Sequence, residues 1–240
     1  MQARPVQPDT GSSLLEDDQA TYPYVMSQAV GGALVSATDH MDALGTLIQD
    51  AHIVHARAPF TLLRAALENS ATAVWLLAQR GQKRALAAQA AAAGADYLDK
   101  ENAERLFTAP RSSRADRQTE LQEIARACGL ADEQITAVTA GKVGFRAVVG
   151  TAAREVPGCP FTDRQAVYCW MAASGIAHAQ RWAVFSSVLA RVEVPGAPEG
   201  STGLALSVDE KALTGIASIT SQMMLEGWRL PGERRRRYLG

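Results

Sequence analysis

Apolar positions along most of the chain recur with the 3.6-residue period of amphipathic α-helices. In residues 22–55, apolar side chains such as Val30 and Leu34 stand three or four positions apart. Residues 58–77 are apolar around most of the helical circumference, which is typical of a buried helix. Pro59 stands in the opening turn, where a helix tolerates proline. We therefore expect two long helices, the second at the centre of the fold.

Three further helices are predicted in the middle of the chain. Residues 82–107 are rich in alanine, the residue with the highest helix propensity. Residues 114–128 precede Gly129, the usual glycine position after a helix, and residues 132–138 have a short helical pattern. Glycines and prolines then predict one long irregular stretch over residues 141–160, the best candidate for a mobile loop or lid.

Two capping-box patterns predict the starts of the last two helices. Thr162 with Gln165 opens a helix whose apolar pattern continues to about residue 189, and we expect this helix to join the second helix at the centre. Ser207 with Glu210 opens the last helix, which Pro231 and the glycine after it are expected to end.

These elements predict an all-α fold, a single up-and-down or orthogonal helical bundle of about six or seven helices. The turn-rich stretch near 191–207 also permits a small β-ribbon. We divide the chain into a flexible N-terminal leader at residues 1–20, a bundle domain at 21–230 and a basic tail at 231–240. The tail is either a solvated chain end or a contact for RNA, an anionic partner or a neighbouring subunit.

Composition narrows the classes of function. The chain has 47% hydrophobic and 20% charged residues, as in ordinary globular proteins, and a formal net charge of −1. This charge makes nucleic acid an unlikely partner, because proteins that bind phosphate backbones carry a basic excess. No apolar run approaches the roughly 20 residues that span a bilayer, so no membrane association is expected.

The cysteines and the N-terminal residues favour the cytoplasm. Cys128, Cys159 and Cys169 are odd in number and lack CxxC or zinc-finger spacing, which indicates neither a disulfide framework nor structural zinc. Cys169 is either a small buried hydrophobe or part of a pocket. Residues 1–20 lack the basic start and apolar core of a signal peptide.

Polar side chains interrupt the second predicted helix. Arg64 and Glu68 stand one turn apart on one face, and Asn69 follows them. If that face is buried, the two charges must be paired, because an unpaired buried charge costs several kcal/mol. They form either an ion pair that links neighbouring helices or the floor of a polar pocket for a charged ligand.

A second polar cluster lies on the helix that begins at Thr162. Ser174, His178 and Trp182 follow at intervals of four and should share a face, while Arg181 is expected to pair with a carboxylate such as Glu68 or Glu226. His178 is either a hydrogen-bonded core residue or an acid, base or ligand-binding donor, and it is the candidate catalytic residue. The neighbouring Gly175 should let a helix or a ligand approach the backbone.

The segments LLRAALENSATAVWLL, residues 62–77, and SGIAHAQRWA, residues 174–183, together resemble uncharacterised all-helical proteins of actinobacterial type. The resemblance covers about a third of the chain and implies no activity. The HEPN ribonuclease toxins, which place an arginine shortly before a histidine on one helix, are a weaker analogy. The analogy is disfavoured, because no histidine of this chain has an arginine four to six residues ahead of it.

No cofactor or metal is expected from the motifs. The chain has no P-loop, no GxSxG elbow and no GxGxxG motif with its acidic partner. His40, His52 and His55 fall within the first predicted helix, where three histidines can hold a divalent metal, but their spacing is poor. Favourable interaction with the helix dipole is the preferred explanation of these histidines.

Two main hypotheses about function follow. The first is a polar pocket between helices for a small, charged molecule, in an enzyme or enzyme subunit of specialised metabolism, lined by Arg64, Glu68, Asn69, Ser174, His178, Arg181 and Trp182. The second is a non-catalytic interaction protein, a homo-oligomer or a partner of another protein, whose polar residues only satisfy one another. HEPN-like ribonuclease activity remains an outside possibility.

Overall fold

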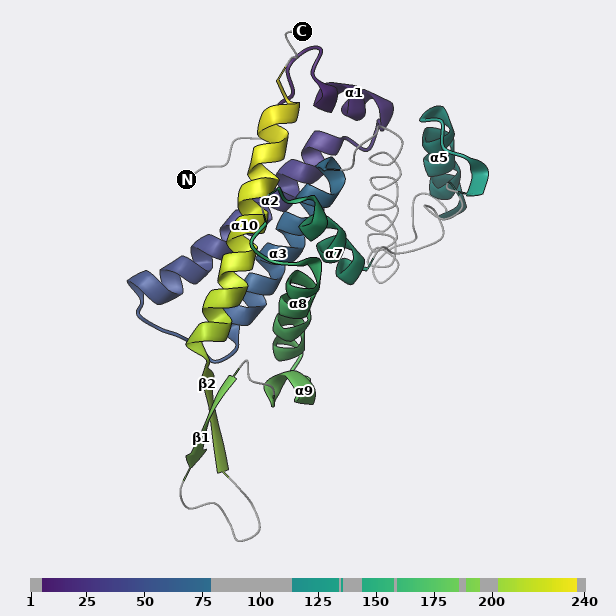
Figure 1. Cartoon of the computed structure of the whole chain (residues 1–240). Helices are drawn as coiled ribbons and strands as arrows, with labels where there is room; N and C mark the ends of the chain where they lie inside the picture. Colours follow the sequence, from purple (N-terminus) through teal and green to yellow (C-terminus); the bar gives the residue numbers. More distant parts are fainter. Residues whose placement is uncertain are drawn as a thin grey trace, which may run out of the picture.

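The computed structural model describes residues 6–78, 114–133, 135, 144–157, 159–185, 189–194 and 203–236. The described elements, drawn in Figure 1, are α1 (Ser13–Ala20), α2 (Met26–Gly45), the π-helical turn η1 (Thr46–Asp50), α3 (Ala58–Leu77), α5 (Arg114–Ala127), α7 (Phe145–Glu155), α8 (Asp163–Ala177), α9 (Arg181–Val184), β1 (Leu189–Val194), β2 (Gly203–Val208) and α10 (Glu210–Arg234). The prediction of an all-α bundle is confirmed. The helix predicted at 82–107 and most of that at 132–138 lie outside the described residues.

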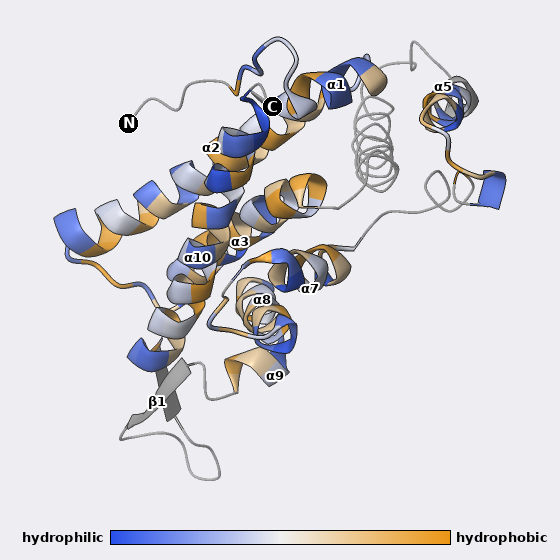
Figure 2. Ribbon diagram, turned by 45° about the horizontal axis from the view of Figure 1, so that its top comes forward, coloured by the Kyte–Doolittle hydropathy of each residue, from blue (hydrophilic) through white to orange (hydrophobic). Residues whose placement is uncertain are grey.

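α3 is the central helix, as its apolar sequence predicts. It packs against α2, α7, α8 and α10, and its side chains Phe60, Leu63 and Leu67 are completely buried. Figure 2 shows that the surrounding helices carry hydrophobic residues on one side and hydrophilic residues on the other. Burial of the apolar sides against α3 is the main favourable term that holds these helices together.

A two-stranded antiparallel hairpin stands at one end of the bundle (Figure 1). β1 pairs with β2 in a register that sets Leu189 opposite Val208 and Val194 opposite Gly203. The hairpin confirms the predicted β-ribbon. Its second strand includes Ser207, so the predicted capping box at that residue is wrong: Asp209 caps α10 instead and accepts a hydrogen bond from the Ala212 N–H.

α8 begins as predicted and ends earlier than predicted. The Thr162 side chain accepts a hydrogen bond from the Gln165 N–H, and the Gln165 side chain accepts from the Thr162 N–H, which completes the capping box. The helix then ends at Ala177. The backbone reverses at Ala179, which has a positive φ of 54°, and the separate short helix α9 folds back.

Gly175 permits this fold-back. A Cβ atom on Gly175 would lie 2.5 Å from the Cβ of Ala183 and 2.9 Å from the Trp182 ring. The expectation that Gly175 allows a helix to approach is therefore confirmed, and the helix is α9. The continuous helix predicted to residue 189 is wrong, because the contact of α9 with α8 competes with the local helical pattern.

The predicted flexible leader contains a packed helix. In α1, Leu14 is fully buried and Asp17 is nearly so. Asp18 accepts hydrogen bonds from the Ser27 N–H and hydroxyl at the start of α2. The prediction of a flexible segment is wrong for residues 13–20, because α1 gains burial and hydrogen bonds that its own sequence does not reveal.

The last helix includes the start of the predicted basic tail. α10 continues through Pro231 to Arg234, so the prediction that Pro231 ends it is wrong. Arg234 makes an ion pair with Asp17 of α1 and donates to the Leu77 carbonyl at the end of α3. These contacts join the end of α10 to α1 and α3, and they offset the hydrogen bond that proline cannot donate.

α7 occupies the stretch that was predicted to be irregular. Val148, Val149, Ala152 and Ala153 form its buried side, which packs against α3 and α8. The prediction of a mobile loop is therefore wrong for residues 145–155. Tertiary burial of this apolar side outweighs the low helix propensity of its glycine.

The first long helix is also shorter than predicted. α2 starts at Met26 rather than at residue 22, and η1 ends at Asp50. His52 and His55 therefore follow the helix, and His52 has a positive φ of 54°. Within the described ranges, no helix is both long and apolar enough to cross a membrane.

Candidate functional site

Four polar side chains form a hydrogen-bonded network: two come from α3, one from the middle of α8 and one from the residue that follows α8. Arg64 Nε donates to Glu68 Oε1 at 2.8 Å, and the Trp170 indole N–H donates to the same oxygen at 2.7 Å. Arg64 Nη1 lies 2.9 Å from His178 Nε2. The predicted proximity of Arg64 and His178 is confirmed, and we call these residues the α3–α8 network.

The hydrogen-bond chemistry assigns the His178 tautomer in this arrangement. A guanidinium only donates, so His178 Nε2 must accept and its ring proton lies on Nδ1. His178 is the residue that ends α8, and it is exposed. The side chains of Arg64 and Glu68 are 24% and 13% exposed. The network therefore ties the end of α8 to α3, with its Glu68 end sheltered and its His178 end open to solvent.

The other predicted site residues do not join the network in the way the sequence suggests. Asn69 donates to the Ala65 carbonyl of its own helix. Trp182 donates to the Gln180 side chain and does not share a helical face with Ser174 and His178, because α8 ends between them.

The predicted partner of Arg181 is also wrong. Glu68 binds Arg64 and Trp170, and Glu226 binds Arg229 at 2.5 Å. Arg181 is exposed at the start of α9. Its charge is thus directed to solvent instead of to either carboxylate.

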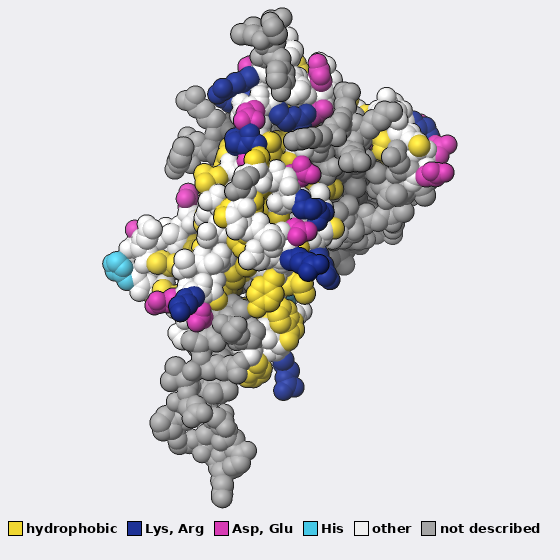
Figure 3. All heavy atoms as spheres, viewed as in Figure 1, with side chains coloured by type: hydrophobic (Ala, Val, Ile, Leu, Met, Phe, Trp, Pro, Cys, Tyr) yellow, Lys and Arg dark blue, Asp and Glu magenta, His cyan; other side chains and the backbone are white. Residues whose placement is uncertain are grey.

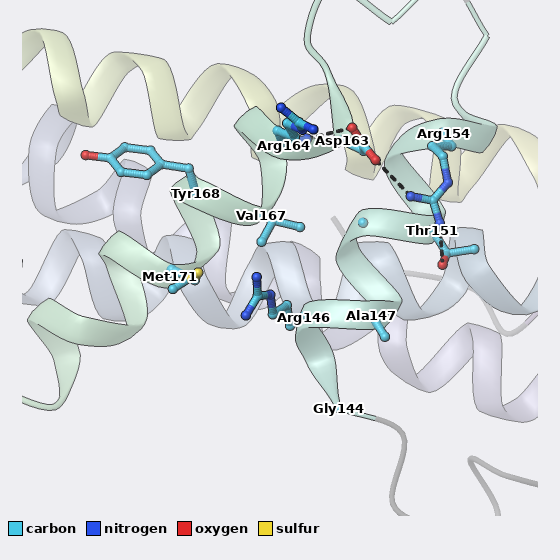
Figure 4. Close-up of a pocket in the computed structure, with 11 residues that line it drawn as sticks. Gly144, Arg146, Ala147, Thr151, Arg154, Asp163, Arg164, Val167, Tyr168 and Met171 are labelled. Carbon is cyan, nitrogen blue, oxygen red and sulfur yellow. Dashed lines mark hydrogen bonds and ion pairs between the residues drawn. The ribbon is translucent and has the colours of Figure 1, made fainter.

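A groove of about 750 Å³ lies between α7 and the first half of α8. Its lining residues are Gly144, Arg146, Ala147, Gly150, Thr151, Arg154, Asp163, Arg164, Val167, Tyr168 and Met171. Gly150 lets α8 approach, because a Cβ atom there would lie 3.2 Å from Val167 Cγ2. Figure 4 shows Arg146 extending from α7 toward Val167, with Arg154 and Asp163 joined at the other side of the groove. We call it the cationic groove.

The charges that line the cationic groove do not balance. Arg154 makes an ion pair with Asp163 at 2.8 Å and also donates to Thr151. The Arg154 hydrogen bond, together with the Arg164 backbone N–H, holds the pKa of Asp163 below its usual value. Three arginines therefore face one ionised carboxylate, and neither Arg146 nor Arg164 has an ion pair with a carboxylate among the described residues.

A second groove, of about 370 Å³, lies on the other side of α8, against α10. Its lining residues are Phe161, Arg164, Gln165, Tyr168, Cys169, Ala172, Ala212, Gly215, Ile216 and Ile219. Most of these side chains are apolar, and burial raises the pKa of the Cys169 thiol. We call it the apolar groove. Arg164 and Tyr168 line both grooves.

Sequence reasoning missed the cationic groove, although part of its signal is local. Arg146, Gly150 and Arg154 follow at intervals of four and lie on one face of a helix, but the segment was not predicted to be helical. None of the residues of the α3–α8 network lines either groove. The predicted polar cluster and the observed grooves are therefore different places on α8.

The described cysteine and histidine side chains do not gather into a metal site. Cys128, Cys159 and Cys169 are free thiols. Among the residues that the structure places, no three His, Cys, Asp or Glu side chains come together in a group that could hold a metal ion.

Comparisons of the chain with protein-family models, with curated proteins and with solved structures found no match. The resemblance of residues 62–77 and 174–183 to helical proteins of actinobacterial type stays a prediction. The geometry and charge of the grooves are therefore the observations that bear on function.

Proposed function

We propose that the protein binds a small anionic molecule in the cationic groove between α7 and α8. The observation that carries this proposal is the excess of arginine over carboxylate in a concave site. Arg146 of α7 and Arg164 of α8 line the groove from different helices, so an anion bound in the groove is attracted by both charges. Arginine suits this role because its planar group binds carboxylates and phosphates through two parallel hydrogen bonds.

The apolar part of the groove supports the same proposal. Ala147, Val167 and Met171 lie among the arginines and provide a surface for the uncharged part of a ligand. A lining that is mainly apolar, with a few convergent polar groups, is usual for small-molecule sites. The ligand is thus expected to carry a carboxylate or phosphate on an apolar body.

Calorimetric titration of the full chain with butyrate and with inorganic phosphate tests the proposal. Arg146→Glu should weaken binding by about 1 kcal/mol, or about fivefold, because an exposed attractive charge becomes repulsive. Binding should also weaken as the salt concentration rises.

Arg57→Glu is the matched control. It changes the net charge by the same amount, and Arg57 is exposed and lines neither groove. We expect this variant to bind like the wild type. Equal weakening by both substitutions would show that the anions respond only to net charge and would contradict the proposal.

A second function, self-association, has its own supporting observation. Trp182 and Phe185, at α9, are 47% and 48% exposed. Figure 3 shows hydrophobic side chains gathered over α8 and α9 on one face of the molecule. Aromatic side chains are enriched at the centres of protein interfaces, so we infer that this face contacts a second copy of the chain.

Sedimentation velocity over a range of protein concentrations tests this inference. Phe185→Ser should reduce the dimer fraction, whereas Leu225→Ser, at an exposed leucine on α10, should leave it unchanged. A monomer at every concentration would rule out the second function.

For the cellular compartment, three free cysteines support a reducing environment, the cytoplasm.

A further inference from the structure

The two grooves are separated only by one ridge of α8. Arg164 and Tyr168 stand one helical turn apart and line both grooves. Val167 and Met171 extend from α8 on the side of the cationic groove, and Cys169 and Ala172 are on the side of the apolar groove. A ligand longer than either groove can therefore reach both by crossing this ridge.

The apolar groove suits an uncharged chain. Ile216 and Ile219 of α10 are buried side chains at its wall, and Ala172 of α8 is completely buried. Gly215 leaves room beside them, because no atom lies within 4 Å of where its Cβ would be. Water in such a space makes few hydrogen bonds, so an apolar group that displaces it gains free energy.

Charge identifies the end of the ligand that lies in each groove. Arg164 is at the border between the two, and Arg146 and Arg154 line only the cationic side. Among the described residues that line the apolar groove, Arg164 is the only charged one. An anionic head is therefore favoured on the α7 side, and an apolar tail is favoured on the α10 side.

We propose that the ligand is an anionic amphiphile with a straight apolar chain, such as a fatty carboxylate, that lies across α8. Its head group binds in the cationic groove, and its chain passes over Tyr168 into the apolar groove. This inference rests on the proposed function and names the class of its ligand. Tyr168, half exposed at the ridge, supplies an aromatic surface for the chain at the crossing point.

The test is the dependence of affinity on chain length. Straight-chain carboxylates of increasing length, each kept below its micelle-forming concentration, are titrated into the full chain. Each methylene that enters the apolar groove should raise the affinity about fourfold, until the groove is full. Gly215→Leu places a side chain in the apolar groove and should weaken long chains while leaving butyrate unaffected.

Two controls make the test specific. Gly32→Leu introduces the same side chain at an exposed α2 glycine that also has no atom within 4 Å of its Cβ position, and it should behave like the wild type. Ala212→Leu fills the apolar groove from another position and should reproduce the Gly215→Leu result. Arg146→Glu should weaken binding of every chain length by the same factor.

The outcomes separate the two proposals. If affinity rises equally with chain length in wild type and Gly215→Leu, or does not rise at all, the amphiphile inference is overturned. In that case, weaker butyrate binding by Arg146→Glu still supports the proposed function. If Arg146→Glu changes nothing at any length, both fail. Anionic phospholipid vesicles are the last probe: binding to vesicles without binding to monomeric carboxylates would overturn the inference in favour of a membrane surface.

Discussion

Replacing Gly175 by alanine should destabilise the protein, because α9 packs directly on that glycine. The added Cβ would lie 2.5 Å from Ala183 Cβ and 2.9 Å from Trp182 Cζ2. Ala183 is completely buried and its Cβ cannot rotate away, so α9 as a whole must shift. Overpacking costs about 1–3 kcal/mol, and the helix propensity of alanine returns about 0.5–1 kcal/mol. We expect the free energy of unfolding to fall by about 1 kcal/mol.

Gly215→Ala is the matched comparison for this substitution. It makes the same chemical change on α10, where no atom lies within 4 Å of the new Cβ. Only the gain in helix propensity applies, so this variant should be more stable than wild type by about 0.5–1 kcal/mol. Urea denaturation followed by far-UV circular dichroism measures both variants under the same conditions.

The difference between the two variants isolates the contact with α9. A Gly175→Ala variant as stable as Gly215→Ala would refute the reasoning, because the close approach would then cost nothing. The contact can also be removed from its other side. In an Ala183→Gly background, Gly175→Ala should cost less than it does in the wild type, and an unchanged cost would assign the destabilisation to a different cause.

Two further predictions concern charged side chains. Glu68→Ala should lower the free energy of unfolding by about 1–3 kcal/mol, because the Trp170 indole N–H loses its acceptor, and unchanged stability in urea would contradict this. Burial raises the pKa of Asp17, so the contribution of Asp17 to stability should be lost as the pH rises through its pKa in the folded protein. The Arg154 hydrogen bond lowers the pKa of Asp163, so the contribution of Asp163 to stability should be lost as the pH falls through its pKa in the folded protein. The free energy of unfolding of the wild type is measured against pH and compared with that of Asp17→Asn and of Asp163→Asn. The differences from these two variants should change with pH in opposite directions, and a change in the same direction would be evidence against the assignment.

Local sequence patterns were sufficient to predict the helices for which the local pattern and the tertiary packing favour the same structure. α3 begins at the predicted residue, Ala58, since Pro59 and a long apolar run mark it from within a few residues. The capping box of Thr162 and Gln165 marks the start of α8 in the same way. Contacts between distant segments decided where local signals conflicted with packing: α7 is helical despite Gly150, and α10 continues through Pro231.

The candidate site also has contacts that the sequence predicts and contacts that only the tertiary structure shows. The pairing of Arg64 with Glu68 could be predicted, because two residues four apart on a helix are neighbours. The contact of Arg64 with His178 joins residues 114 apart in the chain and was predicted only as a consequence of two buried helices meeting. The cationic groove was not predicted, because it requires Arg146 and Arg164 to approach from two helices, one of which was expected to be a loop.

The sequence by itself determined the all-α class, the central position of α3, the cap of α8 and the polar residues available for chemistry. Each of these depends on residues within one or two turns of one another, where propensity, capping and period act directly. Only the tertiary structure decided that α9 folds back on Gly175, that α1 packs against the end of α10, and which arginines line a common groove. Those outcomes depend on burial and charge pairing between segments far apart in the chain, and their free energies exist only once the helices have packed.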